Sequence, residues 1–400
     1  MSRDDYCRLL HDVLIDARIK EIEILKSVPP EMEGMIRENK DRGGVYDKRY
    51  YPLFVVPNEH IVGIPKPLLM LAFRDARTKF YDLIKLPTWT DEQALEVSQT
   101  SLVLLLVGSE NLTAINARKR LLSQNSTTAS LSQEFRITTV ILCSRLQKHS
   151  KSPLIWNYHK QLVSGQLNQF TKTATYRERT KYIEDLSKSE LQTVLVAAEH
   201  HPMNYYAWAF ARWVFADVYG SLLSSPSAKY YSVVFVRKYY ESVVRKIEKW
   251  CFSHPSDTSA WSFFQWVLFK YVDCAHRDIA DRIDDKLLLN KVNEVILFAT
   301  TISLARESVW SFVRRVVADV DYISDSQRDG FVRAINLYLR SRSADAYGTQ
   351  VNDEDMSNKE KAKLKEHERI LDNLRDKDVY VVRSCLNWIA MRTHLKKAAV

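Results

Sequence analysis

Residue types that could perform chemistry are present in the sequence, but they do not stand at the spacing that metal binding or catalysis needs. His200 and His201 are adjacent, so on a helix their side chains point about 100° apart and cannot clamp one ion as an i, i+4 pair would. Cys251 and Cys274 have no accompanying ligands, and no HExxH pattern occurs. The chain also lacks the GxxxxGK[ST] and GxGxxG loops that bind phosphates. It has no GxSxG nucleophile elbow, although a Ser/His/Asp triad built on a different turn stays possible. We therefore expect no metal site in this chain and no nucleotide enzyme.

The charge balance favours an anionic partner without identifying it. Lys and Arg number 58 against 49 Asp and Glu, a formal net charge of +9. Because basic residues are interleaved with acidic ones and form no RNP, zinc-finger or homeodomain pattern, we expect no nucleic acid partner. An acidic partner, a diphosphate or an anionic membrane fits a generally basic surface at least as well.

The composition is typical of a folded protein without a membrane span. Hydrophobic residues make up 46% of the chain and charged residues 27%, while Gly (9) and Pro (11) are scarce, which favours helices. No apolar run approaches the roughly 20 residues that cross a bilayer, so we expect no transmembrane segment. The first residues lack the apolar core of a signal peptide, and the five cysteines are scattered. These features predict reduced thiols and a cytoplasmic location.

Similar short segments recur along the chain and predict a helical repeat. Residues 199–208 and 253–261 share His-Pro, a polar pair and Ala-Trp, and each is followed by a second tryptophan, Trp213 or Trp266, five residues after the first. Five copies are anchored on Ile115, Trp156, Trp208, Trp261 and Trp310. Their spacings of 41, 52, 53 and 49 residues suit helix pairs joined by loops of varying length. We expect these tryptophans to form the core of the repeats.

Each anchor is expected on the second helix of a helix–turn–helix unit. Three capping-box patterns predict where preceding helices begin: Thr90-x-x-Gln93, Ser130-x-x-Gln133 and Ser187-x-x-Glu190. Apolar residues at i, i+3, i+4 and i+7 from Leu191 then form one helical stripe. Such a pair buries its stripe only against neighbouring pairs. The sequence therefore predicts an all-α fold, a right-handed α-α superhelix of antiparallel helix pairs similar to a TPR solenoid.

Three segments follow from this pattern. Residues 1–89 are expected to form an N-terminal helical segment with an irregular stretch at 27–67, where prolines and a Gly-Gly pair gather. Residues 90–320 hold the repeats. Residues 321–400 are expected to form C-terminal helices with a charged linker at 342–362 and a closing helix at roughly 364–395.

The repeat resembles that of protein prenyltransferase alpha subunits, within which it is most similar to the diverged alpha-subunit-repeat-containing proteins. In that repeat a Trp is followed by a polar residue, a further residue and Arg, after an Asn-Tyr or Pro-Ser-Asp lead-in. Residues 204–208 (Asn-Tyr-Tyr-Ala-Trp) and 254–257 (His-Pro-Ser-Asp) match the lead-in, and residues 116–118 keep Asn-x-Arg.

The chain also departs from this pattern. Ile115 replaces the first Trp, and the Arg three residues after the anchor is replaced in the later copies by His159, Ala211, Phe264 and Val313. The hydrogen bonds that this Arg makes between repeats must therefore be rebuilt here, and transferase activity could have been lost.

The resemblance implies the alpha-type subunit of a heterodimeric protein prenyltransferase. A partner beta subunit would hold zinc, with or without magnesium, and this chain no cofactor. The implied substrates are a prenyl diphosphate and proteins with a C-terminal cysteine, such as small GTPases or SNAREs, which would receive a farnesyl or geranylgeranyl group. In the family register Lys151 stands where a catalytic lysine stabilises the leaving diphosphate, and Tyr205 and Tyr206 stand at a substrate-binding position. If the alignment with the family repeat is set aside, Lys151 is expected to be a solvated lysine in a loop. Tyr205 and Tyr206 are then expected to be packing residues.

Two other functions stay open on the sequence. One is a TPR-like adaptor scaffold that binds a protein partner on its concave surface and has no transferase activity. The other, which the charge distribution favours less, is a basic helical protein that binds RNA.

Overall fold

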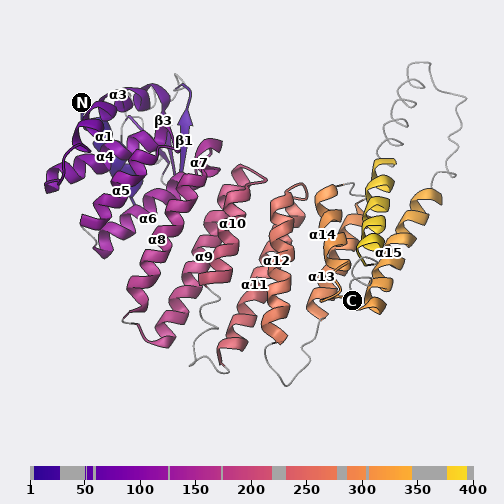
Figure 1. The fold of residues 1–400 in the computed structure, drawn as a ribbon. Helices are drawn as coiled ribbons and strands as arrows, with labels where there is room; N and C mark the ends of the chain where they lie inside the picture. The colour runs from indigo at the N-terminus through magenta and orange to yellow at the C-terminus, as the bar shows by residue number, and fades with distance from the viewer. Residues whose placement is uncertain are drawn as a thin grey trace, which may run out of the picture. The chain divides into compact units, whose positions relative to one another are not determined.

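The predicted helical repeat is confirmed by a computed structural model of the chain. The structure describes residues 4–27, 50, 52–56, 60–124, 127–172, 174–218, 231–276, 286–302, 306–344 and 376–393. These residues are predominantly helical and belong to two compact units, unit 1 (Met1–Leu222) and unit 2 (Leu223–Val400) (Figure 1). Among the described helices, none combines the length and the apolar character needed to cross a bilayer.

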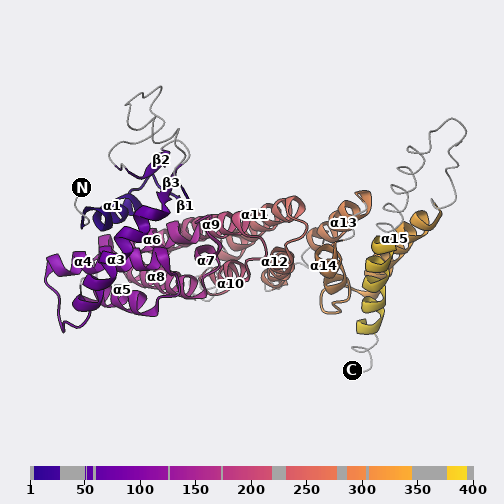
Figure 2. The ribbon, with the colours of Figure 1, turned by 90° about the horizontal axis from the view of Figure 1, so that it is seen from above.

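Helix pairs carry the five anchors of the repeat. Unit 1 contains α4 (Asp91–Val107) with α5 (Leu112–Gln124), α6 (Thr128–Leu142) with α8 (Pro153–Thr171), and α9 (Tyr176–His200) with α10 (Tyr205–Trp213). Unit 2 contains α11 (Tyr231–Ser253) with α12 (Thr258–His276), and α13 (Lys286–Thr301) with α14 (Glu307–Val317). Each anchor lies on the second helix of its pair and is at most 3% exposed. We call these second helices the anchor helices; Figure 2 shows α5, α8 and α10 along one side of unit 1 and α6 and α9 along the other.

A polar residue four positions before the anchor starts the anchor helix in four of these pairs. Its side-chain oxygen accepts a hydrogen bond from the backbone N–H of the residue just before the anchor, which satisfies a donor of the first helical turn. The four capping residues are Asn111, Ser152, Asn204 and Asp257. In the fifth pair, Arg306 occupies this position without a side-chain cap.

One backbone carbonyl, six residues before the anchor, ties consecutive repeats together. The Ser150 carbonyl accepts from the indole Nε1 of Trp156 at 2.8 Å and from the amide of Asn204, in the next repeat, at 2.8 Å. The Pro255 carbonyl likewise accepts from Trp261 Nε1 at 3.2 Å and from the hydroxyl of Ser308. The indole N–H groups are thereby satisfied inside the core.

The first predicted helix start is confirmed and the second is wrong. Thr90 and Gln93 form a reciprocal capping box at the start of α4. α6 begins three residues earlier than expected, with a box between Thr127 and Ser130. Gln133 lies inside the helix, where its side chain contacts His11 instead of the backbone. A hydroxyl three positions upstream therefore caps the helix in place of Ser130.

The third predicted start, at Ser187 and Glu190, is also wrong. Both residues lie in the middle of α9, which begins with a capping box between Thr175 and Glu178. Glu190 is buried and bonds His159 of the preceding repeat. The pattern therefore occurs twice along one helix, and only the upstream copy is a cap.

A small head precedes the repeats and contains strands that the sequence analysis did not predict. It comprises α1 (Asp4–Ile15), β1 (Glu21–Leu25), β2 (Phe54–Val56), β3 (Ile61–Pro65) and α3 (Lys66–Leu83). In the sheet order β1-β3-β2, β1 pairs parallel with β3 and β2 pairs antiparallel with it. β1 lies where a helix was expected, and β2 and β3 lie in the stretch expected to be irregular. The alternation of Glu and Ile in residues 21–24 has the period of a strand, which explains β1.

Within the described part of unit 2, two helices follow the helix of the last anchor. They are α15 (Asp325–Ala344) and a helix at 376–393, joined by a hydrogen bond from the Tyr338 hydroxyl to the Asp378 carboxylate. Most of the expected charged linker at 342–362 and the first part of the expected closing helix lie outside the described residues. The segment boundaries at residues 89 and 320 stay predictions.

His149, on the single turn α7 (Gln147–Ser150), is expected to make unit 1 sensitive to acid. Its Nε2 lies 2.8 Å from the Leu106 carbonyl, and burial lowers its pKa to about 4. Because free histidine titrates near 6.5, the unfolded chain takes up the proton first, and stability falls as the pH drops from about 6.5 to about 4. The loss is roughly 3 kcal/mol at most. In thermal unfolding between pH 7 and pH 4, His149→Gln should lose less stability than the wild-type chain; equal losses would contradict this assignment.

Candidate functional site

A groove in unit 1 lies between the head and the helices α6 and α9. Its volume is about 1030 Å³, and its lining is mainly apolar. The apolar lining includes Ile15 and Ile19 from the head, Phe135 and Val140 from α6, and Val196 from α9. A concave, mainly apolar surface of this size with a few polar groups is the usual form of a small-molecule site.

Arg136 supplies a cation to the wall of this groove. Its Nε donates to the Asp16 carbonyl at 3.0 Å, and its Nη2 donates to the Ile19 carbonyl at 2.8 Å. These bonds hold the chain that leaves α1 against α6. Burial lowers the pKa of Arg136, but a guanidinium stays charged at neutral pH. Among the residues that the structure describes, no carboxylate lies within ion-pair distance of Arg136. The charge of the Asp16 carboxylate, which is bonded to Arg18, acts on it from farther away, so the groove contains a half-buried positive charge without a direct anionic partner.

Lys20 and Glu21 stand at the edge of the groove. Lys20 is exposed and forms no ion pair within the described ranges. Glu21 is the carboxylate of the lining, and it lies 2.9 Å from His200 Nε2 and 3.8 Å from Arg145 Nε. Because neighbours already satisfy this carboxylate, Arg136 and Lys20 leave the groove with a positive potential.

His60 also lines the groove and has a strained backbone. Its φ of 59° lies in the left-handed region, which is unfavourable for a residue other than glycine. Its Nδ1 lies 2.8 Å from the Arg18 carbonyl, and its own carbonyl accepts from the backbone N–H of Lys20. When the ring is neutral and Nδ1 carries the proton, Nε2 is an acceptor. The hydrogen bond between Nδ1 and the Arg18 carbonyl therefore fixes the orientation of an imidazole that lines the same groove as Arg136 and Lys20.

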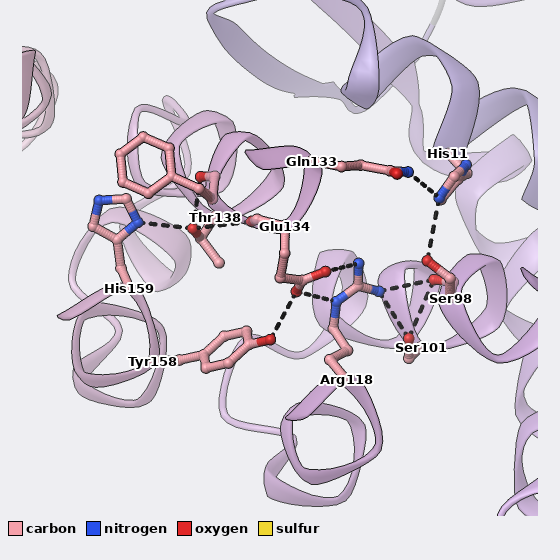
Figure 3. Close-up of polar contacts among 10 residues, drawn as sticks. His11, Ser98, Ser101, Arg118, Gln133, Glu134, Thr138, Tyr158 and His159 are labelled. Atoms are coloured by element: carbon pink, nitrogen blue, oxygen red, sulfur yellow. Dashed lines mark hydrogen bonds and ion pairs between the residues drawn. The ribbon is translucent and has the colours of Figure 1, made fainter. Parts of the chain in front are cut away.

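A buried polar network borders the groove and connects consecutive repeats (Figure 3). Arg118, which is fully buried on α5, donates from Nε and Nη2 to the two carboxylate oxygens of Glu134 on α6, at 2.5 and 2.8 Å. Its Nη1 donates to the Ser98 carbonyl and to the Ser101 hydroxyl, both at 2.8 Å. The Tyr158 hydroxyl donates to Glu134 at 3.1 Å. With no access to solvent, this network holds helices together and cannot meet a substrate.

His159 repeats the same arrangement one repeat later. Both Arg118 and His159 stand three residues after an anchor, and each bonds a glutamate of the next repeat. His159 Nε2 lies 2.8 Å from Glu190, and its Nδ1 lies 2.7 Å from the Thr138 hydroxyl. The hydrogen bonds that were expected to need rebuilding are thus rebuilt here with histidine in place of arginine.

The site residues expected from the family register lie elsewhere. Lys151 donates from Nζ to the Pro202 carbonyl at 3.0 Å, in the turn before α10. Tyr205 and Tyr206 start α10, with 65% and 40% of their surface exposed. The structure thus brings Lys151 close to the turn that leads into the two tyrosines, and none of the three lines the groove. Of the tryptophans expected in the core, those at the anchors are buried, while Trp213 and Trp266 are partly exposed.

The described residues hold no cluster suited to a metal. No group of three or more His, Cys, Asp or Glu side chains is arranged to hold an ion in the ranges that the structure covers. Cys7, Cys143, Cys251 and Cys385 are buried thiols that form no disulfide. Burial raises the pKa of Cys143, Cys251 and Cys385, which keeps these thiols protonated and unreactive.

The comparison with protein families corrects the predicted resemblance. A family model described as the ECM9 middle domain matches residues 155–287, about a third of the chain, from α8 to the start of α13. No curated protein matches the chain. The family found is not that of prenyltransferase alpha subunits, so the predicted resemblance and the predicted role in prenylation are wrong. The adaptor alternative gains no support either, and the expected beta subunit, zinc, magnesium, prenyl diphosphate and C-terminal cysteine substrates lose their basis with the resemblance.

Proposed function

We propose that unit 1 is a ligand-binding module whose groove takes a small molecule with an apolar body and one anionic group, a carboxylate or a phosphate. The observation that carries this proposal is the half-buried Arg136 guanidinium, which has no carboxylate partner among the described residues. Removing a cation from water is costly unless an anion pairs with it. A ligand anion would offset that cost through charge-assisted hydrogen bonds.

The rest of the lining fits the body of such a ligand. Ile19, Phe135 and Val196 offer apolar surface, and each methylene that a ligand buries there contributes about 0.8 kcal/mol. Lys20 can reach the same anion from the edge of the groove, because it lies in the segment whose carbonyls Arg136 holds. His60 adds a fixed polar contact.

Direct binding of simple amphiphiles tests this function. Undecanoate, decyl phosphate and decanol share one ten-carbon alkyl chain, so calorimetry on the full chain isolates the contribution of the anion. We expect both anions to bind at least tenfold more tightly than decanol, and Lys20→Met to weaken the anions three- to tenfold. Lys26→Met, which removes an exposed lysine outside the groove, is the matched control. Equal affinity for decanol, or equal losses in the two variants, would overturn the proposal.

A cytoplasmic location is part of the same proposal. It is supported by Cys143, Cys251 and Cys385, which are buried thiols in no disulfide, as is usual where the surroundings keep thiols reduced.

A further inference from the structure

The anchor helices of unit 1 carry charge of one sign. α5, α8 and α10 contain no Asp or Glu. Their basic residues are Arg118, Lys119, Arg120, Lys160 and Arg212. The acidic residues of these repeats lie mostly on α4 and α9, on the first helices of the pairs. Basic and acidic residues that are interleaved along the sequence therefore lie mostly on different helices of each pair.

Three of the cations occupy one position of the repeat. Lys119, Lys160 and Arg212 each stand four residues after an anchor. Because α5, α8 and α10 follow one another along one side of unit 1, the three positions fall in a row, one on each helix (Figure 2). The exposed Asn116 and Asn157 stand one residue after an anchor, on the same side of their helices as the cations.

Aromatic rings hold two of these cations in place. Lys119 Nζ lies 5.8 Å from the centre of the Tyr158 ring, and Lys160 Nζ lies 4.8 Å from the centre of the Trp213 ring, in each case on the next anchor helix. Neither lysine forms an ion pair within the described part of the chain. The contacts with the ring faces order the ammonium groups while leaving their N–H donors available to a ligand.

Exposed aromatic rings continue this surface on α10. Tyr205 lies two helical turns before Arg212 on the same side of the helix, and 65% of its surface is exposed. The adjacent Tyr206 ring is 5.7 Å away, centre to centre, at an angle of 76°. We call the surface formed by Asn116, Lys119, Asn157, Lys160, Tyr205 and Arg212 the basic face.

From this arrangement we infer that the basic face of unit 1 binds single-stranded nucleic acid. A row of cations without acidic neighbours on its helices complements a chain of phosphates, exposed rings stack on bases, and amides bond base edges. An acidic protein segment would satisfy the cations but would give the Tyr205 ring no base to stack on. We expected no nucleic acid partner because basic and acidic residues are interleaved along the sequence. In the fold, the basic residues of α5, α8 and α10 lie on helices that contain no acidic residue. The inference is independent of the groove, which lies on the side of α6 and α9.

Fluorescence anisotropy with labelled 12-nucleotide oligouridylate and oligothymidylate tests this site on the full chain. Phosphate contacts from Lys119 and Lys160 predict a slope of about −1.4 when the logarithm of the binding constant is plotted against the logarithm of the salt concentration. Lys160→Met should reduce the slope by about 0.7. Tyr205→Ala should weaken binding at least fivefold and leave the slope unchanged, because stacking releases no counterions. The matched control, Lys181→Met on the exposed side of α9, should bind like wild type.

Two outcomes would overturn the inference. Polyglutamate of matched charge that competes as well as the oligonucleotides would assign the basic face to an acidic protein segment. A loss in Lys181→Met equal to that in Lys160→Met would show attraction to overall charge rather than a site. Preference for oligouridylate over oligothymidylate would identify RNA as the ligand through contacts to the 2′-hydroxyl, and equal affinity would identify a site for either strand.

Discussion

Glu134→Leu is expected to lower the free energy of unfolding of the chain by about 3–5 kcal/mol, because it leaves a fully buried guanidinium without its anion. Arg118 would lose both carboxylate acceptors and keep only the Ser98 carbonyl and the Ser101 hydroxyl. The Tyr158 hydroxyl would lose its acceptor as well. Urea unfolding followed by tryptophan fluorescence measures the loss.

A double variant separates the lost ion pair from any change in packing. Adding Arg118→Met to Glu134→Leu removes the stranded charge, so most of the stability should return. The exposed ion pair between Asp82 and Lys85 serves as the comparison for the buried pair. Asp82→Ala breaks it and should change the free energy of unfolding by less than about 1 kcal/mol. A double variant as unstable as Glu134→Leu would show that the site depends on the shape of these side chains and not on their charge.

The repeat could be predicted from the sequence because its information is local. In four of the five copies the anchor and its capping residue lie four positions apart, about one helical turn, and the stripe from Leu191 shows the helical period directly. The exact first residues of the helices were harder to predict. Thr127 caps α6 and Thr175 caps α9, but a second capping-box pattern follows each of them along the sequence. A pattern shows that a hydroxyl can cap a helix, but packing decides which hydroxyl does.

The groove and the head could not be predicted because they depend on pairing between distant segments. β1 pairs with β3 about 40 residues later, and Arg136 bonds the carbonyls of Asp16 and Ile19 from more than 100 residues along the chain. The positive φ of His60 has no signature in residue type. The separation of charge onto the basic face is likewise invisible until the first and second helices of each pair are assigned to opposite sides.

The mistaken family assignment has a physical origin in the anchors themselves. Trp156 and Trp261 each donate to a carbonyl six residues earlier, and both rings are buried. Trp89, which lies outside the five copies, makes the same bond to the Leu83 carbonyl at 2.9 Å. The bond from an indole N–H to a carbonyl six residues earlier therefore also forms outside the repeat, since Trp89 lies between α3 and α4, and it does not identify a family.

Trp156→Ala is expected to lower the free energy of unfolding by about 3–5 kcal/mol, the usual cost of emptying a large buried site. Its ring is 3% exposed and packs on Phe210 of the next repeat, with ring centres 5.1 Å apart. Trp213→Ala is the matched control, because that ring is partly exposed and its removal opens a smaller void. Urea unfolding should give a clearly smaller loss for the control.

Trp156→Phe then divides the loss between burial and the hydrogen bond. Phenylalanine keeps most of the buried area but cannot donate to the Ser150 carbonyl, which would retain the Asn204 amide as its donor. A loss of about 1–2 kcal/mol is expected, since one donor to the Ser150 carbonyl remains and only part of the volume is lost. A loss as large as that of Trp156→Ala would mean that the indole N–H, and not the ring, is what connects the second repeat to the third.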